Sequence, residues 1–172
     1  MQHDYIKLLI KSAKQGKKNA YRELCNINLK KIYNIAVRFL LSEKVAEIIT
    51  QDIFIEAWDN LRFLREEQSF EVWLKSIAIY RLLDETRTGK VRAKLIEENL
   101  ISENENEITS TDRFENIILS LPEKERISFI LHDIEKYTYE EIADFFSEMT
   151  KEEIQLMIRE TRKGIISSET YV

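Results

Sequence analysis

The fold of this chain is decided by residues 42–87, which read SEKVAEIITQDIFIEAWDNLRFLREEQSFEVWLKSIAIYRLLDETR. Apolar residues at three- and four-residue spacing predict two long amphipathic helices here, separated by a charged connector at residues 65–68. Ser42 and Ser69 stand just before the two apolar runs, as N-cap residues do, and neither run contains Pro or Gly. The core stripe predicted for the first helix consists of Ala46, Ile49, Ile53, Ala57 and Leu61.

A second line along the first predicted helix mixes apolar and acidic side chains. It consists of Ile48, Asp52, Ile55 and Asp59. The line is either the edge of a wide core stripe, which would bury both isoleucines, or a docking face for another protein, which would expose them. Periodicity alone leaves both interpretations open.

The composition predicts an all-α protein. At 172 residues the chain is long enough for one domain or two small ones, and 44% hydrophobic with 33% charged residues is typical of a globular protein. Only three Gly and one Pro are present, too few to supply the turns of many β-hairpins.

The rare residue types argue against a metal site, a cofactor site and a disulfide. Cys25 is the only cysteine, and His3 and His132 have no Cys or His partners at metal-ligand spacing. Neither a Gly-rich phosphate loop nor a nucleophile–base motif is visible, so we expect a protein that is not an enzyme and has no cofactor. With no long apolar run and no signal-peptide pattern, we expect it to be cytoplasmic.

Charge is distributed in blocks along the sequence. Residues 1–94 carry a net charge of +6, residues 95–112 carry −6, and residues 113–172 carry −5. Such blocks suggest separate modules with different partners, of which only the basic one is suited to nucleic acid.

The rest of the chain divides accordingly. Helices over about residues 4–15 and 18–41, the first capped by Asp4 and stopped by Gly16, complete a four-helix domain at residues 1–94. Residues 95–112 lose helical periodicity and gain acidic, Asn, Ser and Thr residues, which predicts a flexible acidic linker.

Residues 113–172 predict a helix-turn-helix domain. A helix from Glu123 to about Lys136 follows a short first helix and Pro122. Two capping boxes, Thr138 with Glu141 and Thr150 with Glu153, open the last two helices.

Three segments also carry a family resemblance. The runs AEIITQDIFIEAW (46–58) and SFEVWLKSIAIYRLLD (69–84) resemble region 2 of sigma factors of the extracytoplasmic-function (ECF) type, in the sigma-70 family. LPEKERISFILHDIEKYTYEEIADFF (121–146) resembles their region 4. The resemblance implies a transcription factor that binds core RNA polymerase and directs it to promoter DNA, and that an anti-sigma factor can bind.

The resemblance also implies the site residues. Those implied for polymerase binding, toward a coiled coil of the β′ subunit, are Glu47, Gln51, Asp52, Ile55 and Asp59. Those implied for DNA binding are Lys75, Tyr80, Arg81, Arg87, Lys90 and Arg92 in the first domain and Gln155, Arg159, Arg162 and Lys163 in the last helix.

The chain departs from the family pattern at three places. Ile48 replaces an Asp of the docking face, and Tyr80 replaces an Asn that helps to capture the unpaired promoter strand; Tyr can stack on a base but reads sequence less sharply. In the last helix Gln155, Leu156 and Met157 replace basic and hydroxyl residues that would face DNA. Leu156 and Met157 either pack inward or face a protein groove.

Two functions therefore remain in view. One is a divergent sigma factor that reads promoters. The other is a degenerate sigma-like regulator that binds an anti-sigma factor or modulates polymerase without reading promoters.

Overall fold

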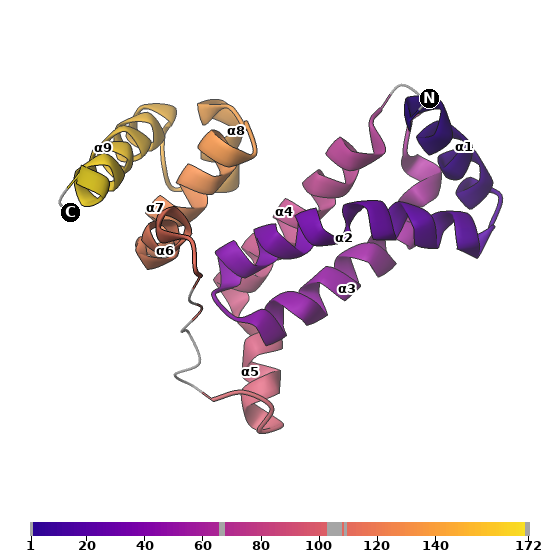
Figure 1. Ribbon diagram of the computed structural model, residues 1–172, viewed down its shortest axis with the longest axis horizontal. Coiled ribbons are helices and arrows are strands. Elements are labelled where there is room, and N and C mark those ends of the chain that lie inside the picture. The colour runs from indigo at the N-terminus through magenta and orange to yellow at the C-terminus, as the bar shows by residue number, and fades with distance from the viewer. Residues whose placement is uncertain (1, 66–67, 103–107, 109, 171–172) are drawn as a thin grey trace. The chain divides into compact units, whose positions relative to one another are not determined.

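The computed structural model describes residues 2–65, 68–102, 108 and 110–170. Every regular element within these residues is helical, which confirms the predicted all-α class (Figure 1). The chain divides into two compact units, residues 1–105 and residues 106–172.

Unit 1 is built around three long helices. Its elements are α1 (Gln2–Lys14), α2 (Lys18–Leu40), α3 (Glu43–Asn60), the 3₁₀ turn η1 (Leu61–Phe63), α4 (Phe70–Thr88) and α5 (Lys90–Glu97). Helix α2 packs against α1, α3 and α4, while α3 also packs against α4 and α5 (Figure 1). The core stripe predicted for α3 is confirmed, since Ala46, Ile49, Ile53, Ala57 and Leu61 are all buried.

The helix ends of unit 1 follow the capping residues in part. Ser42 caps α3 as predicted, because its hydroxyl accepts a hydrogen bond from the Val45 N–H at 3.3 Å. Gly16 adopts the left-handed conformation after α1, with φ +84°. Asp4 is not an N-cap, since α1 begins at Gln2 and places this carboxylate in its first turn. Ser69 occupies the N-cap position of α4, but its side chain makes no capping hydrogen bond.

The end of unit 1 lies beyond the basic segment at residues 87–94. Helix α5 runs to Glu97, and two apolar residues after position 94, Leu95 and Ile101, are buried. Residues 103–107 and 109 of the predicted linker lie outside the described residues. Residues 95–97 are helical rather than part of a linker, and a flexible linker remains a prediction only for the residues that follow.

Unit 2 is a small helical unit that ends in the expected pair of helices. Its elements are α6 (Arg113–Ser120), α7 (Glu123–Phe129), the π-helical turn η2 (Ile130–Ile134), α8 (Tyr139–Phe145) and α9 (Lys151–Thr170). Helix α9 packs against α6, α7 and α8. Ile118, Ile127, Ile142, Ile154 and Ile158 form the centre of the core and are almost fully buried.

Both predicted capping boxes of unit 2 are confirmed. The Thr138 hydroxyl accepts the Glu141 N–H at 3.2 Å, and the Glu141 carboxylate accepts the Thr138 N–H at 2.8 Å. Thr150 and Glu153 make the same reciprocal pair, at 3.3 and 2.7 Å. The single helix predicted from Glu123 to about Lys136 is wrong in detail. Helix α7 ends at Phe129, the π-helical turn η2 continues to Ile134, and Lys136 follows in the left-handed conformation with φ +68°.

Candidate functional site

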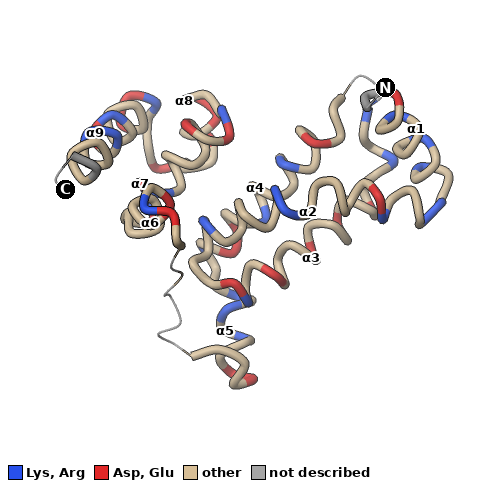
Figure 2. The backbone as a smooth tube through the Cα atoms, in the orientation of Figure 1, with Lys and Arg blue, Asp and Glu red and all other residues tan. Residues whose placement is uncertain are grey.

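The outer face of α3 presents a row of exposed side chains. Glu47, Gln51, Ile55 and Asp59 recur every four residues and are all exposed. Ile55 keeps 61% of its surface accessible, so it is not part of the core. The interpretation of a wide core stripe, which would bury both isoleucines, is therefore wrong for Ile55. Ile48 is half-buried and lies at the edge of the core stripe. Figure 2 shows the acidic residues that recur along α3.

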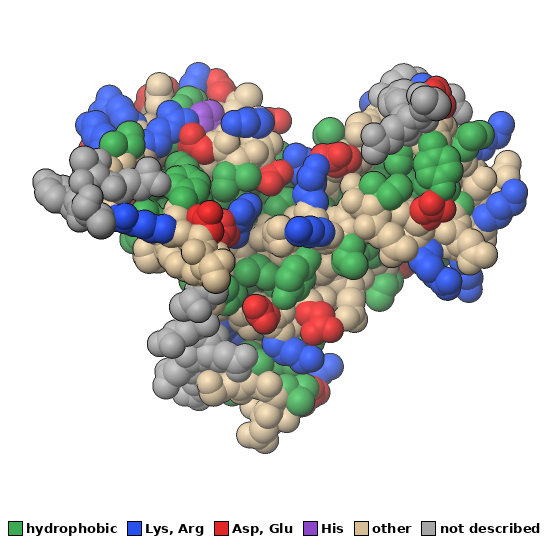
Figure 3. Space-filling view, in the orientation of Figure 1, with side chains coloured by type: hydrophobic (Ala, Val, Ile, Leu, Met, Phe, Trp, Pro, Cys, Tyr) green, Lys and Arg blue, Asp and Glu red, His purple; other side chains and the backbone are tan. Residues whose placement is uncertain are grey.

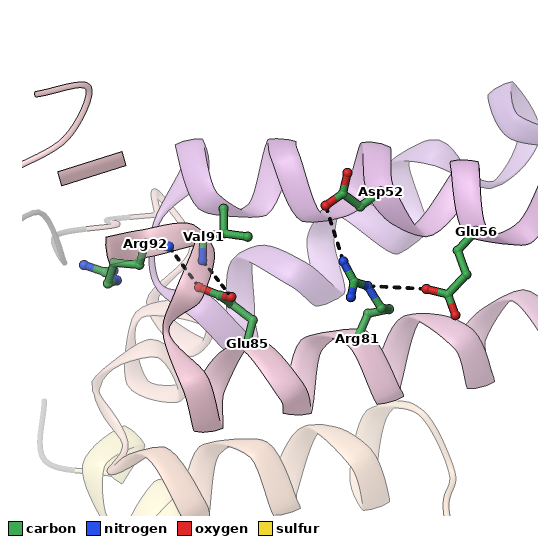
Figure 4. Close-up of polar contacts among 6 residues, drawn as sticks. All are labelled: Asp52, Glu56, Arg81, Glu85, Val91 and Arg92. Carbon is green, nitrogen blue, oxygen red and sulfur yellow. Dashed lines mark hydrogen bonds and ion pairs between the residues drawn. The ribbon is translucent and has the colours of Figure 1, made fainter. Parts of the chain in front are cut away.

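Asp52 lies beside this row and is bound from α4. The Nη2 of Arg81 is 3.3 Å from the Asp52 Oδ2, and its Nε is 3.4 Å from the Oε2 of Glu56 (Figure 4). Because all three side chains are more than a third exposed, each ion pair contributes only about 0–1 kcal/mol. The structure thus joins a residue predicted for polymerase binding, Asp52, to one predicted for DNA binding, Arg81.

The outer face of α4 carries the other predicted residues of that helix. Tyr80 is 66% exposed, and Lys75 is half-buried. Arg87 lies in the last turn, where its Nη2 is 2.8 Å from the Oδ1 of Asp84 and lowers the pKa of that carboxyl. An aromatic ring exposed beside cations can stack with an unpaired base.

Residues 90–94 of the basic segment lie in α5, which has a buried inner side and an exposed outer side. Lys90 and Lys94 are exposed, and Lys94 forms a long ion pair with Glu98 at 3.9 Å. The predicted DNA ligand Arg92 is half-buried, and its Nη2 donates to the carbonyl of Leu40 at 3.4 Å. Arg92 therefore has a structural contact at the end of α2.

The sequence analysis did not single out Glu85, a buried residue of α4 whose carboxylate lies at the start of α5. Its carboxylate accepts the backbone N–H groups of Val91 and Arg92 (Figure 4). The signal was available in the sequence, because a helix that begins after Gly89 has no capping side chain of its own. Glu56 was overlooked as well, although it lies one turn beyond Asp52.

In unit 2, three of the four residues predicted for DNA binding line a shallow hollow on α9, and Lys163 is the exception. The hollow has a volume of about 390 Å³, and it is lined by Tyr139, Glu152, Gln155, Leu156, Arg159 and Arg162. Leu156 is 51% exposed and Met157 is half-buried. The interpretation that both pack inward is therefore wrong for Leu156.

The predicted cations of α9 are ion-paired with acidic residues of unit 2. Arg162 lies 2.7 Å from Asp133, and this carboxylate raises the pKa of the guanidinium. Glu160 pairs with both Lys163, at 2.9 Å, and Arg159, at 3.3 Å. These two cations lower the pKa of the Glu160 carboxyl, with Lys163 having the larger effect. Figure 2 shows acidic and basic residues following one another along α9.

Arg126 is another residue to which the sequence analysis gave no role. Its guanidinium is buried and donates to the Leu121 carbonyl at 2.8 Å, and burial lowers its pKa. It is the Arg of the LPEKER segment, so this part of the region 4-like motif maintains the turn between α6 and α7.

The surface of the described residues is mixed in character. Hydrophobic, acidic and basic side chains are interspersed on the face of the molecule in Figure 3. Within the described residues, no group of three or more His, Cys, Asp or Glu could hold a metal ion. No helix among them is long and apolar enough to cross a membrane.

Two family models match the chain. Sigma-70 region 2 matches residues 24–91, which include α3 and α4, and Sigma-70 region 4 matches residues 111–147. The two matches follow one another in separate units of the structure.

Curated relatives and solved structures agree with these matches. The ECF RNA polymerase sigma factor SigW of Bacillus subtilis (strain 168) is 26% identical over 161 residues, which cover 83% of this chain and 85% of the relative. The ECF RNA polymerase sigma-E factor of Haemophilus influenzae is 25% identical over 154 residues, 79% of this chain and 80% of the relative.

Among solved structures, CnrH in complex with the cytosolic domain of CnrY has a TM-score of 0.60 at 18% identity, covering 96% of this chain and 97% of that one. The sigma factor RpoE in complex with the anti-sigma factor NepR, from Bartonella quintana, has a TM-score of 0.60 at 15% identity and covers 88% and 97%. These likenesses show that the fold is shared.

A region 2 match lies in unit 1, a region 4 match lies in unit 2, and the curated relatives over most of the sequence are of the same type. The chain belongs to the sigma-70 family of RNA polymerase sigma factors, which act in transcription initiation, and within it to the ECF type.

Proposed function

We propose that this protein binds core RNA polymerase through the exposed row on α3 and directs it to promoter DNA. The observation that carries the proposal is Ile55, a 61% exposed apolar side chain among Glu47, Gln51 and Asp59. An apolar contact surrounded by polar groups is the usual anatomy of a protein interface. Carboxylates and amides around it can accept hydrogen bonds from Arg or Lys of the partner.

The DNA-binding part of the proposal rests on α4 and α5. Tyr80 is an exposed ring on which an unpaired base can stack, and Lys90 and Lys94 are exposed cations that can contact phosphates. The net charge of +6 over residues 1–94 favours the approach of nucleic acid. Unit 1 therefore supplies most of the promoter binding in this proposal.

Unit 2 contributes less to DNA binding. Arg159, Arg162 and Lys163 are already ion-paired with Glu160 or Asp133, and these carboxylates compete with a phosphate for them. Each phosphate contact releases counterions and contributes to affinity, so cations already paired within the protein gain less from DNA.

Titration of core polymerase with a fluorescently labelled full-length chain tests the docking face. Ile55→Glu should weaken binding at least about tenfold, because charged replacement of a central apolar contact in an interface costs more than about 1.4 kcal/mol. Leu8→Glu is the matched control: Leu8 is 63% exposed and lies on α1, away from the row on α3. The control should bind core within about twofold of the wild type.

Circular dichroism must show equal helicity for both variants. Equal core affinity of Ile55→Glu and the wild type, or no binding of the wild type at low salt, would rule out this docking face.

A second candidate function is regulation by protein–protein contact without promoter reading. The paired cations of α9 and the exposed Leu156 favour it, and an anti-sigma factor is then the expected partner. Run-off transcription and a footprint with the reconstituted holoenzyme separate the two. A promoter-specific footprint supports the first function, and core binding without any footprint supports the second.

A further inference from the structure

Glu85 is the one buried carboxylate that connects α4 to α5 among the described residues. Only 6% of its surface is exposed. Its Oε2 accepts the Val91 N–H at 3.1 Å, and its Oε1 accepts the Arg92 N–H at 3.0 Å (Figure 4). Both carboxylate oxygens are therefore used on adjacent amides in the first turn of α5.

These two hydrogen bonds replace a conventional N-cap. The residue before α5 is Gly89, which ends α4 in the left-handed conformation (φ +59°) and has no side chain with which to cap α5. The first amides of a helix have no partners within it, and a negative charge near them is favourable. An eight-residue helix is marginal on its own, so α5 depends on such external contacts.

Two further contacts fix the rotation of α5. Arg92 donates to the Leu40 carbonyl at 3.4 Å, and Leu95 is buried. With Arg92 and Leu95 on the inner side of α5, Lys90 and Lys94 remain on its exposed side. They are four residues apart and therefore lie on one line of the helix.

We propose that Glu85 is a positioning residue for DNA binding: by holding the first turn of α5, it keeps Lys90 and Lys94 oriented toward the phosphates of the opened promoter strand. This inference rests on the proposed function. Glu85 itself contacts no DNA, because its carboxylate is buried against the backbone of α5.

The sign of the effect distinguishes positioning from plain electrostatics. Glu85→Gln removes a negative charge near a DNA-binding helix, which by charge alone would tighten DNA binding. Glutamine also has only one acceptor oxygen, so one of the two amides loses its partner. Positioning therefore predicts weaker binding from a change that makes the protein more positive.

The test uses the full chain bound to core polymerase and a labelled fork-junction DNA with a single-stranded non-template end. Glu85→Gln should weaken the DNA affinity about three- to tenfold, in line with the usual cost of losing an N-cap, and should reduce the salt dependence. The matched control Glu97→Gln removes an exposed charge from the same helix and should leave the affinity unchanged or raise it.

Amide hydrogen exchange in the free protein supplies a second readout. In Glu85→Gln the amides of Val91 and Arg92 should exchange faster, whereas core affinity through α3 should stay within about twofold of the wild type. If Glu85→Gln fails to unfold cooperatively, Glu85→Asp is used in its place. Glu85→Asp retains the charge on a side chain shorter by one methylene and should show an intermediate loss of DNA affinity.

DNA affinity of Glu85→Gln equal to or above that of Glu97→Gln overturns the inference and leaves the proposed function intact. If the wild-type holoenzyme itself fails to bind the fork DNA, promoter binding as proposed is wrong and the inference falls with it.

Discussion

Arg81 of α4 is ion-paired with the face of α3 that we propose for polymerase docking, and it is itself a residue that we propose for DNA binding. Its removal tests whether the two proposed functions of these faces are independent. Its guanidinium lies between Asp52 and Glu56, at 3.3 and 3.4 Å from their carboxylates. The two acidic residues are one turn apart, so Arg81→Gln leaves two like charges facing each other at i, i+4 spacing.

The expected cost is small because the site is open to water. Two ion pairs with side chains 36–42% exposed are worth about 0.5 kcal/mol each, and the unshielded carboxylates add a few tenths. We expect Arg81→Gln to lower the free energy of unfolding by about 1 kcal/mol at low salt and by much less at 1 M salt.

The same variant should strengthen polymerase binding. If a cation of the polymerase binds Asp52, it competes with Arg81 in the wild type. Freed of that competition, Arg81→Gln should bind core up to about fivefold more tightly, since the gain cannot exceed about 1 kcal/mol. DNA binding by the holoenzyme should fall modestly if Arg81 also reaches a phosphate.

Urea unfolding followed by circular dichroism, at about 0.05 and 1 M NaCl, measures the first effect, and titration of core polymerase measures the second. Arg87→Gln is the control, because Arg87 forms one pair with Asp84 and its side chain is 79% exposed; its removal should cost less than about 0.3 kcal/mol. A loss above about 3 kcal/mol, or one that does not depend on salt, would refute this weak-pair account.

Three further predictions concern stability and reactivity. Ile53→Ala, at a fully buried position, should lower the free energy of unfolding by about 2–5 kcal/mol. Ile55→Ala, on the exposed side of the same helix, should change it by less than about 0.5 kcal/mol. Similar urea midpoints for the two variants would contradict the packing of α3. Burial raises the pKa of the Cys25 thiol, so its reaction with a disulfide reagent at about pH 8 should be several-fold slower in the folded protein than in urea, and equal rates would contradict this. Hydrogen bonds from Thr150 hold the pKa of Glu153 below its ordinary value of 4.5, so the stabilisation is present above pH 4.5 and is lost as the pH falls through the lower folded-state pKa. Glu153→Gln should therefore flatten the acid side of a titration of helicity against pH. Identical acid transitions for the variant and the wild type would refute the prediction.

The local patterns of the sequence predicted most of the helices because local chemistry sets them. The apolar stripe of α3, its Ser42 cap and the two capping boxes of unit 2 all depend on residues within one or two turns of each other. The errors have a related cause. Asp4 and Ser69 are acceptable cap residues, but helix ends also depend on packing and on neighbouring turns, and the π-helical turn η2 leaves no periodic signature over so few residues.

The site was harder to predict, because charge partners come from different helices. The motifs point to Asp52 and Arg81 separately, while only the packing of α3 on α4 places them 3.3 Å apart. Whether Ile55 is exposed is decided in the same way. Its spacing fits a wide core stripe as well as a surface, and the rotation of α3 against α2 and α4 determines which side faces water.

By itself, the sequence determined the all-α class, the helix stripes, the charge blocks and the family, since composition, periodicity and ungapped motifs are properties of the chain alone. Only the tertiary structure decided which charges remain available. Arg92 is turned onto the end of α2, Arg162 is bound to Asp133, and Glu85 caps α5 across the turn at Gly89. The physical reason is that hydrogen bonds and ion pairs act over about 3–4 Å, and residues 6 to 52 positions apart reach that distance only when their helices pack.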